Sequence, residues 1–319
     1  MKKGNKALVI LSVLGLIGTA LTGCGKKDGV FNIGVSQYVE HAALDASYKG
    51  FVDALAEAGY VDGEKIKIDY QNAQGDQSNT NTIATKLVND NNDLILAIAT
   101  PSAQAVANAT KDIPVLVTAV TDPYDAGLVE SNEVPGGNIS GTSDLTPVRK
   151  QFELLTQLLP NAKKVAILYT SSETNSKVQA QMARDAAAEF GLETLDATVS
   201  NTNEIQQVVE SLIGKVEAIY APTDNLIAKA MPTVAMVANT NELPIICGEK
   251  GMVEAGGLAT YGIDYYELGK LTGQQAVQII EGKATEDMPI GYLAEENCEL
   301  TINEEVAKQL GIEIPPDLR

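Results

Sequence analysis

Apolar and polar positions alternate regularly along most of the chain, from Val30 onward. Short apolar runs predict strands at residues 31–35, 65–70, 94–99, 115–120, 164–169, 193–199, 218–221, 245–246 and 259–261. Between them, apolar residues three and four positions apart predict helices at 42–58, 76–90, 103–109, 148–159, 176–190, 204–213 and 227–240. This strand–helix alternation predicts an α/β protein whose parallel sheets are covered by helices on both faces.

The alternation falls into two series that meet around residues 136–147. A chain of 319 residues is too long for one ordinary hydrophobic core, so two domains are expected. No strict sequence repeat relates the two series. We therefore expect two similar doubly wound parallel-sheet lobes that are alike in structure rather than in sequence.

The first residues have the pattern of an export signal. Three lysines precede a mostly apolar stretch at residues 7–21, which is short for a membrane span and typical of a signal-peptide core. The stretch ends in Leu21-Thr22-Gly23-Cys24, which resembles the bacterial lipobox. Residues 1–23 are therefore predicted to be a lipoprotein signal peptide, and Cys24 the lipid-modified start of an anchor and linker at 24–28. An uncleaved membrane anchor is the alternative.

Composition excludes several classes of function. The net charge of −19 would repel nucleic acid and anionic lipid headgroups, so neither is expected as a partner of the folded part. His41 is the single histidine, and the sequence has no C-x-x-C, H-E-x-x-H, Walker A or G-x-G-x-x-G motif. No metal and no cofactor are therefore expected. Besides Cys24, the chain has only Cys247, expected to be a buried thiol, and Cys298.

Loops after the predicted strands are the candidate site, because ligands of open α/β sheets bind beyond the carboxyl ends of the strands. These loops are residues 36–41, 100–102, 121–124, 169–172, 222–225 and 261–265. They are rich in hydroxyls, carboxylates and tyrosines, which is typical of a site for a small polar ligand with an apolar part.

The segment Thr100-Pro101-Ser102 lies where a strand turns into a helix, and three interpretations are open. It is a plain helix cap, a cradle of backbone N–H groups for a carboxylate or phosphate, or the site of a nucleophilic Ser102. The nucleophile would need His41 as its base, and no glycines form an elbow around Ser102. A serine hydrolase is therefore disfavoured, although it remains an alternative.

Two other segments carry acidic residues, the loop after the predicted strand 218–221 and the proposed crossing between the domains. Asp224 and Asn225 form a turn that could bind a ligand ammonium or simply begin a helix, and Asp144 could place a second carboxylate near the cleft. Several tyrosines at strand ends favour an aromatic or amphipathic ligand.

Several motifs together carry a family resemblance. Besides the lipobox, they are Ile33-Gly34-Val35-Ser36-Gln37-Tyr38 with His41, Ala99-Thr100-Pro101-Ser102-Ala103-Gln104, Val120-Thr121-Asp122-Pro123, Gly141-Thr142-Ser143-Asp144, Pro222-Thr223-Asp224-Asn225 and Tyr261-Gly262-Ile263-Asp264-Tyr265. In this order they resemble the ABC-transporter substrate-binding lipoproteins of the tryptophan/aromatic amino acid branch, over residues 21–316. That family has the type I periplasmic-binding-protein fold, two lobes joined by a hinge.

The resemblance implies discontinuous lobes, because three segments cross between them. Lobe one is expected to hold 29–144 plus 265–283, and lobe two 145–264 plus 284–319. The ligand would lie between them and be buried by hinge closure.

The resemblance also implies roles for individual residues. Thr100 and Ser102, with Thr121 nearby, would hold an amino acid's carboxylate. Asp224 and Asn225, with Asp144 as a further candidate, would hold its ammonium. The ligand side chain would be flanked by Tyr38, His41 and Tyr261.

The expected function is therefore that of a monomeric, non-enzymatic receptor. It would be lipid-anchored on the extracytoplasmic face of the cell membrane and deliver an amino acid, expected to be aromatic, to ABC permease subunits. A ligand-sensing surface receptor without transport is the other alternative of the same fold.

Overall fold

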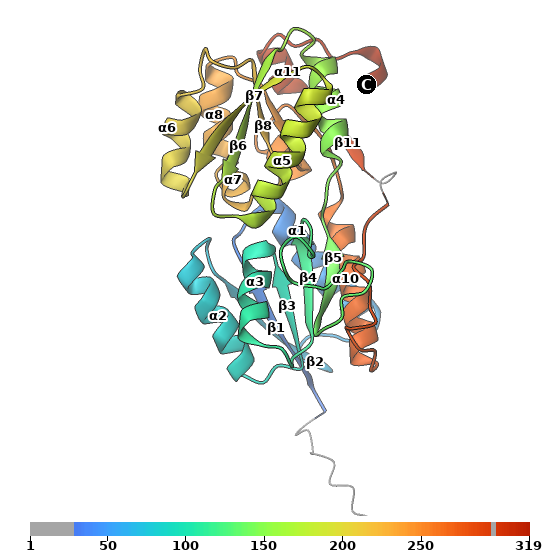
Figure 1. Ribbon diagram of the computed structural model, residues 1–319. Helices are drawn as coiled ribbons and strands as arrows, with labels where there is room; N and C mark the ends of the chain where they lie inside the picture. The colour runs from blue at the N-terminus through green and yellow to red at the C-terminus, as the bar shows by residue number, and fades with distance from the viewer. Residues whose placement is uncertain (1–28, 295–297) are drawn as a thin grey trace, which may run out of the picture.

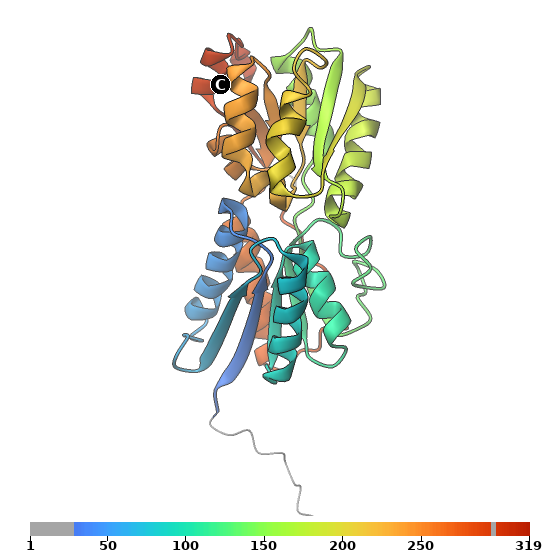
Figure 2. The ribbon, with the colours of Figure 1, turned by 90° about the vertical axis from the view of Figure 1, so that its left-hand side faces the viewer.

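The computed structural model describes residues 29–294 and 298–319. The predicted signal peptide and Cys24 lie outside the described residues. The chain forms two α/β lobes stacked end to end, with lobe one below and lobe two above in Figure 1. The view turned by 90° shows the same two units joined by narrow crossing segments (Figure 2).

Lobe one contains a five-stranded parallel sheet in the order β2-β1-β3-β4-β5. Its strands are β1 (Phe31–Gln37), β2 (Ile66–Asn72), β3 (Leu94–Ile98), β4 (Val115–Val120) and β5 (Ile139–Ser143). Its helices are α1 (Ala42–Glu57), α2 (Gln77–Asn89), α3 (Thr100–Ala109) and α10 (Tyr265–Ile280). Apolar clusters fill the space on both faces of this sheet.

Lobe two repeats this arrangement in a six-stranded sheet of order β11-β10-β9-β8-β6-β7, in which only β11 is antiparallel. Its strands are β6 (Lys164–Thr170), β7 (Glu193–Val199), β8 (Ala218–Ala221), β9 (Ile245–Cys247), β10 (Ala259–Gly262) and β11 (Glu299–Ile302). Its helices are α4 (Val148–Leu158), α5 (Thr174–Glu189), α6 (Ile205–Glu210), α7 (Asn225–Lys229), α8 (Met231–Thr240), α9 (Lys250–Glu254) and α11 (Glu304–Gln309), with 3-10 turns at Thr202–Glu204 and Pro316–Leu318.

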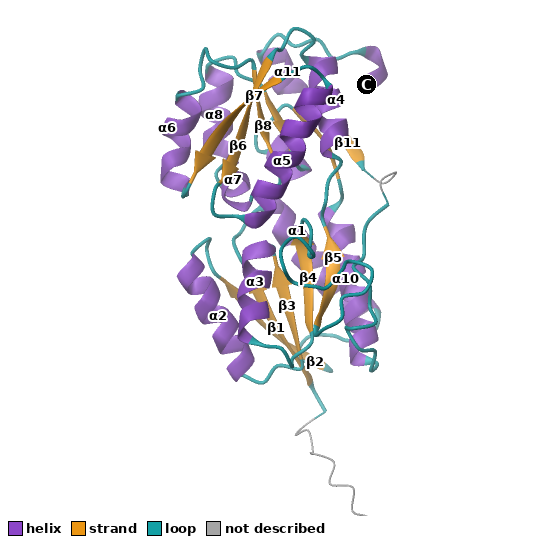
Figure 3. Ribbon diagram, viewed as in Figure 1, coloured by secondary structure: helices purple, strands orange, loops and turns teal. Residues whose placement is uncertain are grey.

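The predicted fold class is confirmed: helices cover both faces of two doubly wound sheets (Figure 3). The predicted helix at 227–240 is instead two helices, α7 and α8, because Pro232 lies in the first turn of α8, where proline is compatible with the start of a helix but not with its interior. Strand β5, which sequence reasoning took as the joint between lobes, is made of small and polar residues. It packs closely because Gly141, at φ 138°, has no side chain; a Cβ there would lie 2.0 Å from the Val117 carbonyl oxygen.

Lobe one is completed by chain from far along the sequence. Helix α10 packs along α1, and glycines allow the backbones to touch: a Cβ on Gly269 would lie 2.0 Å from the Ser47 carbonyl oxygen. The segment after α10 also stays on lobe one. Ser140 Oγ donates to the carbonyl of Met288 at 2.7 Å, and Thr285 Oγ1 donates to that of Gly137 at 3.0 Å. We expected residues 284–319 to belong to lobe two. This is wrong for the segment up to Gly291, which forms an isolated β-bridge with Thr142 of β5.

Within the described residues, no helix is both long and apolar enough to cross a membrane.

Candidate ligand-binding cleft

The carboxyl ends of the two sheets face each other across the junction of the lobes (Figure 1). A small, nearly filled cavity lies at this junction. In both sheets the strand order reverses nearby, between β1 and β3 and between β6 and β8, which is where ligands bind in open α/β folds. The residues that line the cavity are His41, Leu44, Ala119, Thr121, Asp144, Asn175, Thr223, Asp224, Asn225, Ala228, Glu249 and Tyr265. Five of the predicted site residues are among them: His41, Thr121, Asp144, Asp224 and Asn225.

Direct hydrogen bonds join the lobes across this cavity. Gln179 of α5 donates from Nε2 to Thr121 Oγ1 of lobe one at 2.9 Å, and the same amide donates to Thr223 Oγ1 of its own lobe. His41 Nε2 lies 3.5 Å from Asn225 Oδ1 of lobe two. The lobes are therefore in a closed arrangement around the site.

Asp224 organises the lobe-two side of the cavity. It caps the start of α7 by accepting from the Ile227 N–H at 2.9 Å. It also accepts from the N–H and hydroxyl of Thr170, at 2.6 and 2.8 Å, and from Ser176 Oγ at 2.7 Å. Burial raises the pKa of this carboxyl. Four donors occupy the positions at which a carboxylate accepts, so Asp224 has little capacity left for a direct bond to a ligand ammonium.

Glu173, which sequence reasoning missed, lies beside it and is only 2% exposed. Its Oε2 accepts from Asn225 Nδ2 at 2.5 Å and from Asn175 Nδ2 at 3.1 Å. Its Oε1 and the Asn175 Oδ1 are buried and have no hydrogen-bond partner. Burial, followed by the charge of Asp224, raises the pKa of Glu173 to about 8. The sequence did indicate this position weakly: Glu173 comes directly after residues 169–172, the loop that we predicted to follow this strand.

Asp144 provides a third carboxyl group, on the lobe-one side. Tyr265 donates from its hydroxyl to Asp144 Oδ2 at 2.7 Å. Asp144 Oδ1 is buried without a donor in hydrogen-bonding geometry, although the nearby Thr121 hydroxyl helps to lower the pKa of the carboxyl. Burial outweighs these hydrogen bonds and raises the pKa of Asp144 to about 6.

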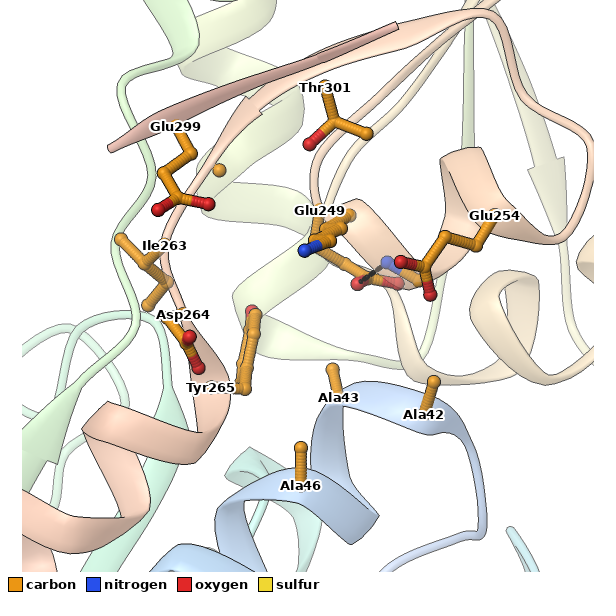
Figure 4. Close-up of a pocket in the computed structure, with 13 residues that line it drawn as sticks. Ala42, Ala43, Ala46, Glu249, Glu254, Ile263, Asp264, Tyr265, Glu299 and Thr301 are labelled. Atoms are coloured by element: carbon orange, nitrogen blue, oxygen red, sulfur yellow. Dashed lines mark hydrogen bonds between the residues drawn. The ribbon is translucent and has the colours of Figure 1, made fainter. Parts of the chain in front are cut away.

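Glu249 of lobe two is the fourth carboxyl group that lines the cavity. It caps α9 by accepting from the N–H groups of Gly251, at 2.5 Å, and Met252, at 2.9 Å. Burial raises its pKa to about 7. Glu249 and Tyr265 also line a second, more open hollow of about 220 Å³, whose floor is formed by alanines of α1 (Figure 4). These two side chains therefore separate the cavity from the second hollow.

The charges in the cavity are unbalanced. No lysine or arginine is among its lining residues in the described part of the chain. His41 is a poor counter-ion, because burial lowers its pKa to about 4 and leaves it neutral at pH 7. A site with buried carboxyl groups, unpartnered acceptors and no cation is suited to a ligand that brings a positively charged donor.

The other predicted site residues do not line this cavity. Helix α3 begins at Thr100, so Ser102 lies in its first turn, and Ser102 Oγ accepts from Ser36 Oγ at 3.3 Å. Thr100 Oγ1 is buried without a partner. Tyr38 packs in the lobe-one core with its hydroxyl donating to the Gly75 carbonyl at 3.2 Å. Tyr261 packs against the lobe-two core.

The nucleophile interpretation of Ser102 has no support in this geometry. Ser102 is fully buried and hydrogen-bonds to Ser36, whereas the His41 ring contacts Asn225. No hydrogen bond between Ser102 and His41 occurs among the described residues, and none of them form a group of three or more metal-ligating side chains.

Two similar lobes closed over a polar cavity at their strand ends define a two-lobed solute-binding protein of the type I periplasmic kind. Comparison with known proteins agrees. The chain belongs to the family of ABC transporter substrate binding proteins, whose model matches residues 32–319. The family resemblance of the sequence motifs is thereby confirmed.

Individual relatives are similar over nearly the whole chain. A tyrosine-binding protein of Clostridioides difficile is 47% identical, over 97% of this chain and 93% of its own length. An ABC domain from Streptococcus pneumonia in complex with L-Trp has a TM-score of 0.88 and 43% identity, covering 90% of this chain and 97% of that one. A ligand-free, open substrate binding protein with adhesive properties from Clostridium difficile has a TM-score of 0.68 and 47% identity, with coverages of 90% and 97%.

The last two comparisons differ in an informative way. The chain is more identical to the open, ligand-free protein, yet it superimposes better on the ligand-bound one. This agrees with the hydrogen bonds between the lobes, which place the present structure in a closed arrangement.

Proposed function

We propose that this protein binds an amino acid with an aromatic side chain in the inter-lobe cavity and delivers it to an ABC permease without catalysing a reaction. The observation that carries the proposal is the pair of unpartnered buried acceptors, Glu173 Oε1 and Asn175 Oδ1, in a cavity without a lysine or arginine. An α-ammonium group has three N–H donors and a positive charge, so it would satisfy both acceptors and balance the carboxylate.

The remaining parts of an amino acid also have matching surfaces. Leu44, Ala119 and the Tyr265 ring form an apolar wall for a side chain. The first turn of α3, with the unpartnered Thr100 hydroxyl, is our candidate for the carboxylate, because helix N-termini favour anions; it lies outside the lining of the cavity in this closed arrangement. The relatives support an aromatic ligand, since one is named a tyrosine-binding protein and another was crystallised with L-Trp.

Calorimetry with the 20 common amino acids tests this function. We expect one ligand per monomer, with aromatic amino acids bound most tightly. Glu173→Gln should weaken binding of every amino acid at pH 7.5, because the ammonium loses its charged partner. Glu193→Gln, at an exposed glutamate where β7 of the same lobe begins, is the control and should leave affinity unchanged. Tight binding of a sugar and none of an amino acid would refute the proposal.

We also propose that Cys24 is lipid-modified and anchors the receptor on the extracytoplasmic face of the membrane. The basic head, the apolar stretch and the lipobox-like Leu21-Thr22-Gly23-Cys24 support this. Expression with a radiolabelled fatty acid should label the wild type and not Cys24→Ala. Equal labelling of both proteins would contradict the anchor.

A further inference from the structure

The buried carboxyl groups of the cavity form two separate pairs. In lobe two, the charge of Asp224 acts on Glu173, whereas on the other side the charge of Asp144 acts on Glu249 and Tyr265. Each pair has one carboxylate oxygen without a hydrogen-bond partner, Glu173 Oε1 and Asp144 Oδ1. A zwitterionic amino acid has one ammonium group, so one of these two acceptors needs a different donor.

The walls of the cavity indicate which acceptor this is. The lobe-two wall is polar around Glu173, with Asn175, Thr223 and Asn225. The opposite wall has the apolar part of the lining, because Leu44, Ala119 and the Tyr265 ring belong to the hydrophobic core of lobe one; His41, Thr121 and Asp144 lie beside them. Asp144 is the carboxyl group on this apolar side, held there by the Tyr265 hydroxyl. An aromatic ring would lie against this wall, with its edge directed toward Asp144.

We propose that Asp144 Oδ1 accepts a hydrogen bond from a donor on the ligand ring, the phenolic O–H of tyrosine or the indole N–H of tryptophan. Asp144 is then a specificity-determining residue that disfavours phenylalanine, and Tyr265 is a positioning residue that occupies Oδ2 and leaves Oδ1 for the ligand. This inference rests on the proposed amino acid function and assigns the recognition of its ring.

The physical basis is the cost of an unsatisfied buried acceptor. Asp144 is 4% exposed, and the nearby Thr121 hydroxyl is not in hydrogen-bonding geometry with its Oδ1. A ligand without a ring donor would therefore leave this oxygen poorly satisfied in a closed site. Sites that hydrogen-bond a substrate group strongly reject analogues that lack it. At pH 7.5 the carboxylate form predominates, because the pKa of Asp144 is about 6. We therefore expect tyrosine or tryptophan to bind at least about tenfold more tightly than phenylalanine.

The test is isothermal titration of tyrosine, tryptophan and phenylalanine into the wild type, Asp144→Ala and Glu173→Gln at pH 7.5. Asp144→Ala should weaken tyrosine or tryptophan at least about tenfold and phenylalanine little, so that the preference collapses. Glu173→Gln should weaken all three by a similar factor and keep the preference. Equal weakening of all three by Asp144→Ala would overturn the proposal, because a structural or ammonium-binding role has that effect.

Two further outcomes are decisive. Phenylalanine bound by the wild type as tightly as both other ligands would refute the role of Asp144 and leave the amino acid function intact. Failure of the wild type to bind any amino acid would instead refute the proposed function. If Asp144→Ala does not fold, Tyr265→Phe keeps the carboxylate and removes only its positioning hydroxyl. It should reduce the preference for tyrosine or tryptophan over phenylalanine; an unaltered preference would contradict the proposal.

Discussion

Glu173→Gln is expected to remove most of the pH dependence of ligand binding. In the free protein, burial and the neighbouring Asp224 raise the pKa of Glu173 to about 8, so its carboxyl group is largely protonated at pH 7. A bound ammonium favours the ionised form and lowers that pKa. Binding should therefore release a proton from Glu173 at pH values between the lowered pKa of the complex and about 8.

The magnitude follows from this linkage. While the free carboxyl is protonated and the bound one is ionised, affinity changes by about tenfold per pH unit. Between pH 5.5 and 7.5 the wild type should gain up to about 100-fold in affinity as pH rises. The glutamine variant should lack this contribution, so the two proteins should bind almost equally at pH 5.5 and differ most at pH 7.5.

Isothermal titration at several pH values measures the slope, and buffers of different ionisation enthalpy count the released protons. Asp144 and Glu249, with pKa values of about 6 and 7, titrate in the same range, so the variant comparison is needed to isolate Glu173. Parallel pH profiles for the wild type and Glu173→Gln would refute the assignment of the ammonium to Glu173.

Other substitutions test the framework of the site. Asp224→Ala should lower the free energy of unfolding by a few kcal/mol, measured by urea denaturation, because donors from Thr170 and Ser176 lose a buried acceptor. An unchanged midpoint would contradict this structural role. Gly269→Ala should lower the free energy of unfolding by about 1–3 kcal/mol or more, because the added Cβ would clash with the backbone of α1. A melting temperature equal to that of the wild type would show that the two helices can move apart without loss of stability. Gln179→Ala should weaken ligand affinity and expand the ligand-free protein in small-angle scattering, because a hydrogen bond between the lobes is lost. Identical scattering curves would mean that this contact does not hold the lobes closed.

The overall fold was predictable because most of its strands are buried and strongly apolar. Strands β4 and β8 have the predicted bounds for this reason. The edge strand β7 also has the predicted bounds, although most of its residues are not buried. Strand β5 was not predictable, because its burial depends on the small size of residues such as Gly141 rather than on hydrophobicity. The antiparallel edge strand β11 was likewise not predicted, because its short sequence has no distinct apolar pattern. Its pairing partner β10 is also distant in sequence.

The site was predicted in part because strand-end loops can be located from the sequence. What a loop carboxyl does cannot be determined in this way. Asp224 and Glu173 both follow strands, yet the first is saturated by donors from other loops and the second has an unpartnered oxygen. The difference arises from contacts with residues about 50 positions away, between loops that only the folded sheet brings together. Tyr261 illustrates the converse. Its position at a strand end favoured a ligand-binding role, whereas its side chain packs against the lobe-two core.

The packing of α10 on α1 has a consequence for how the protein acquires its structure. Helix α1 is among the first elements to be synthesised, whereas α10 follows more than 200 residues later. Until α10 emerges, the apolar face that it covers on lobe one has no partner. Strands β6 to β10 of lobe two are contiguous in sequence and can pair earlier through more local contacts, whereas β11 and α11 complete this lobe only after α10. We therefore expect the α1 surface of lobe one to be where a growing chain is most prone to aggregate or to need a chaperone before α10 emerges.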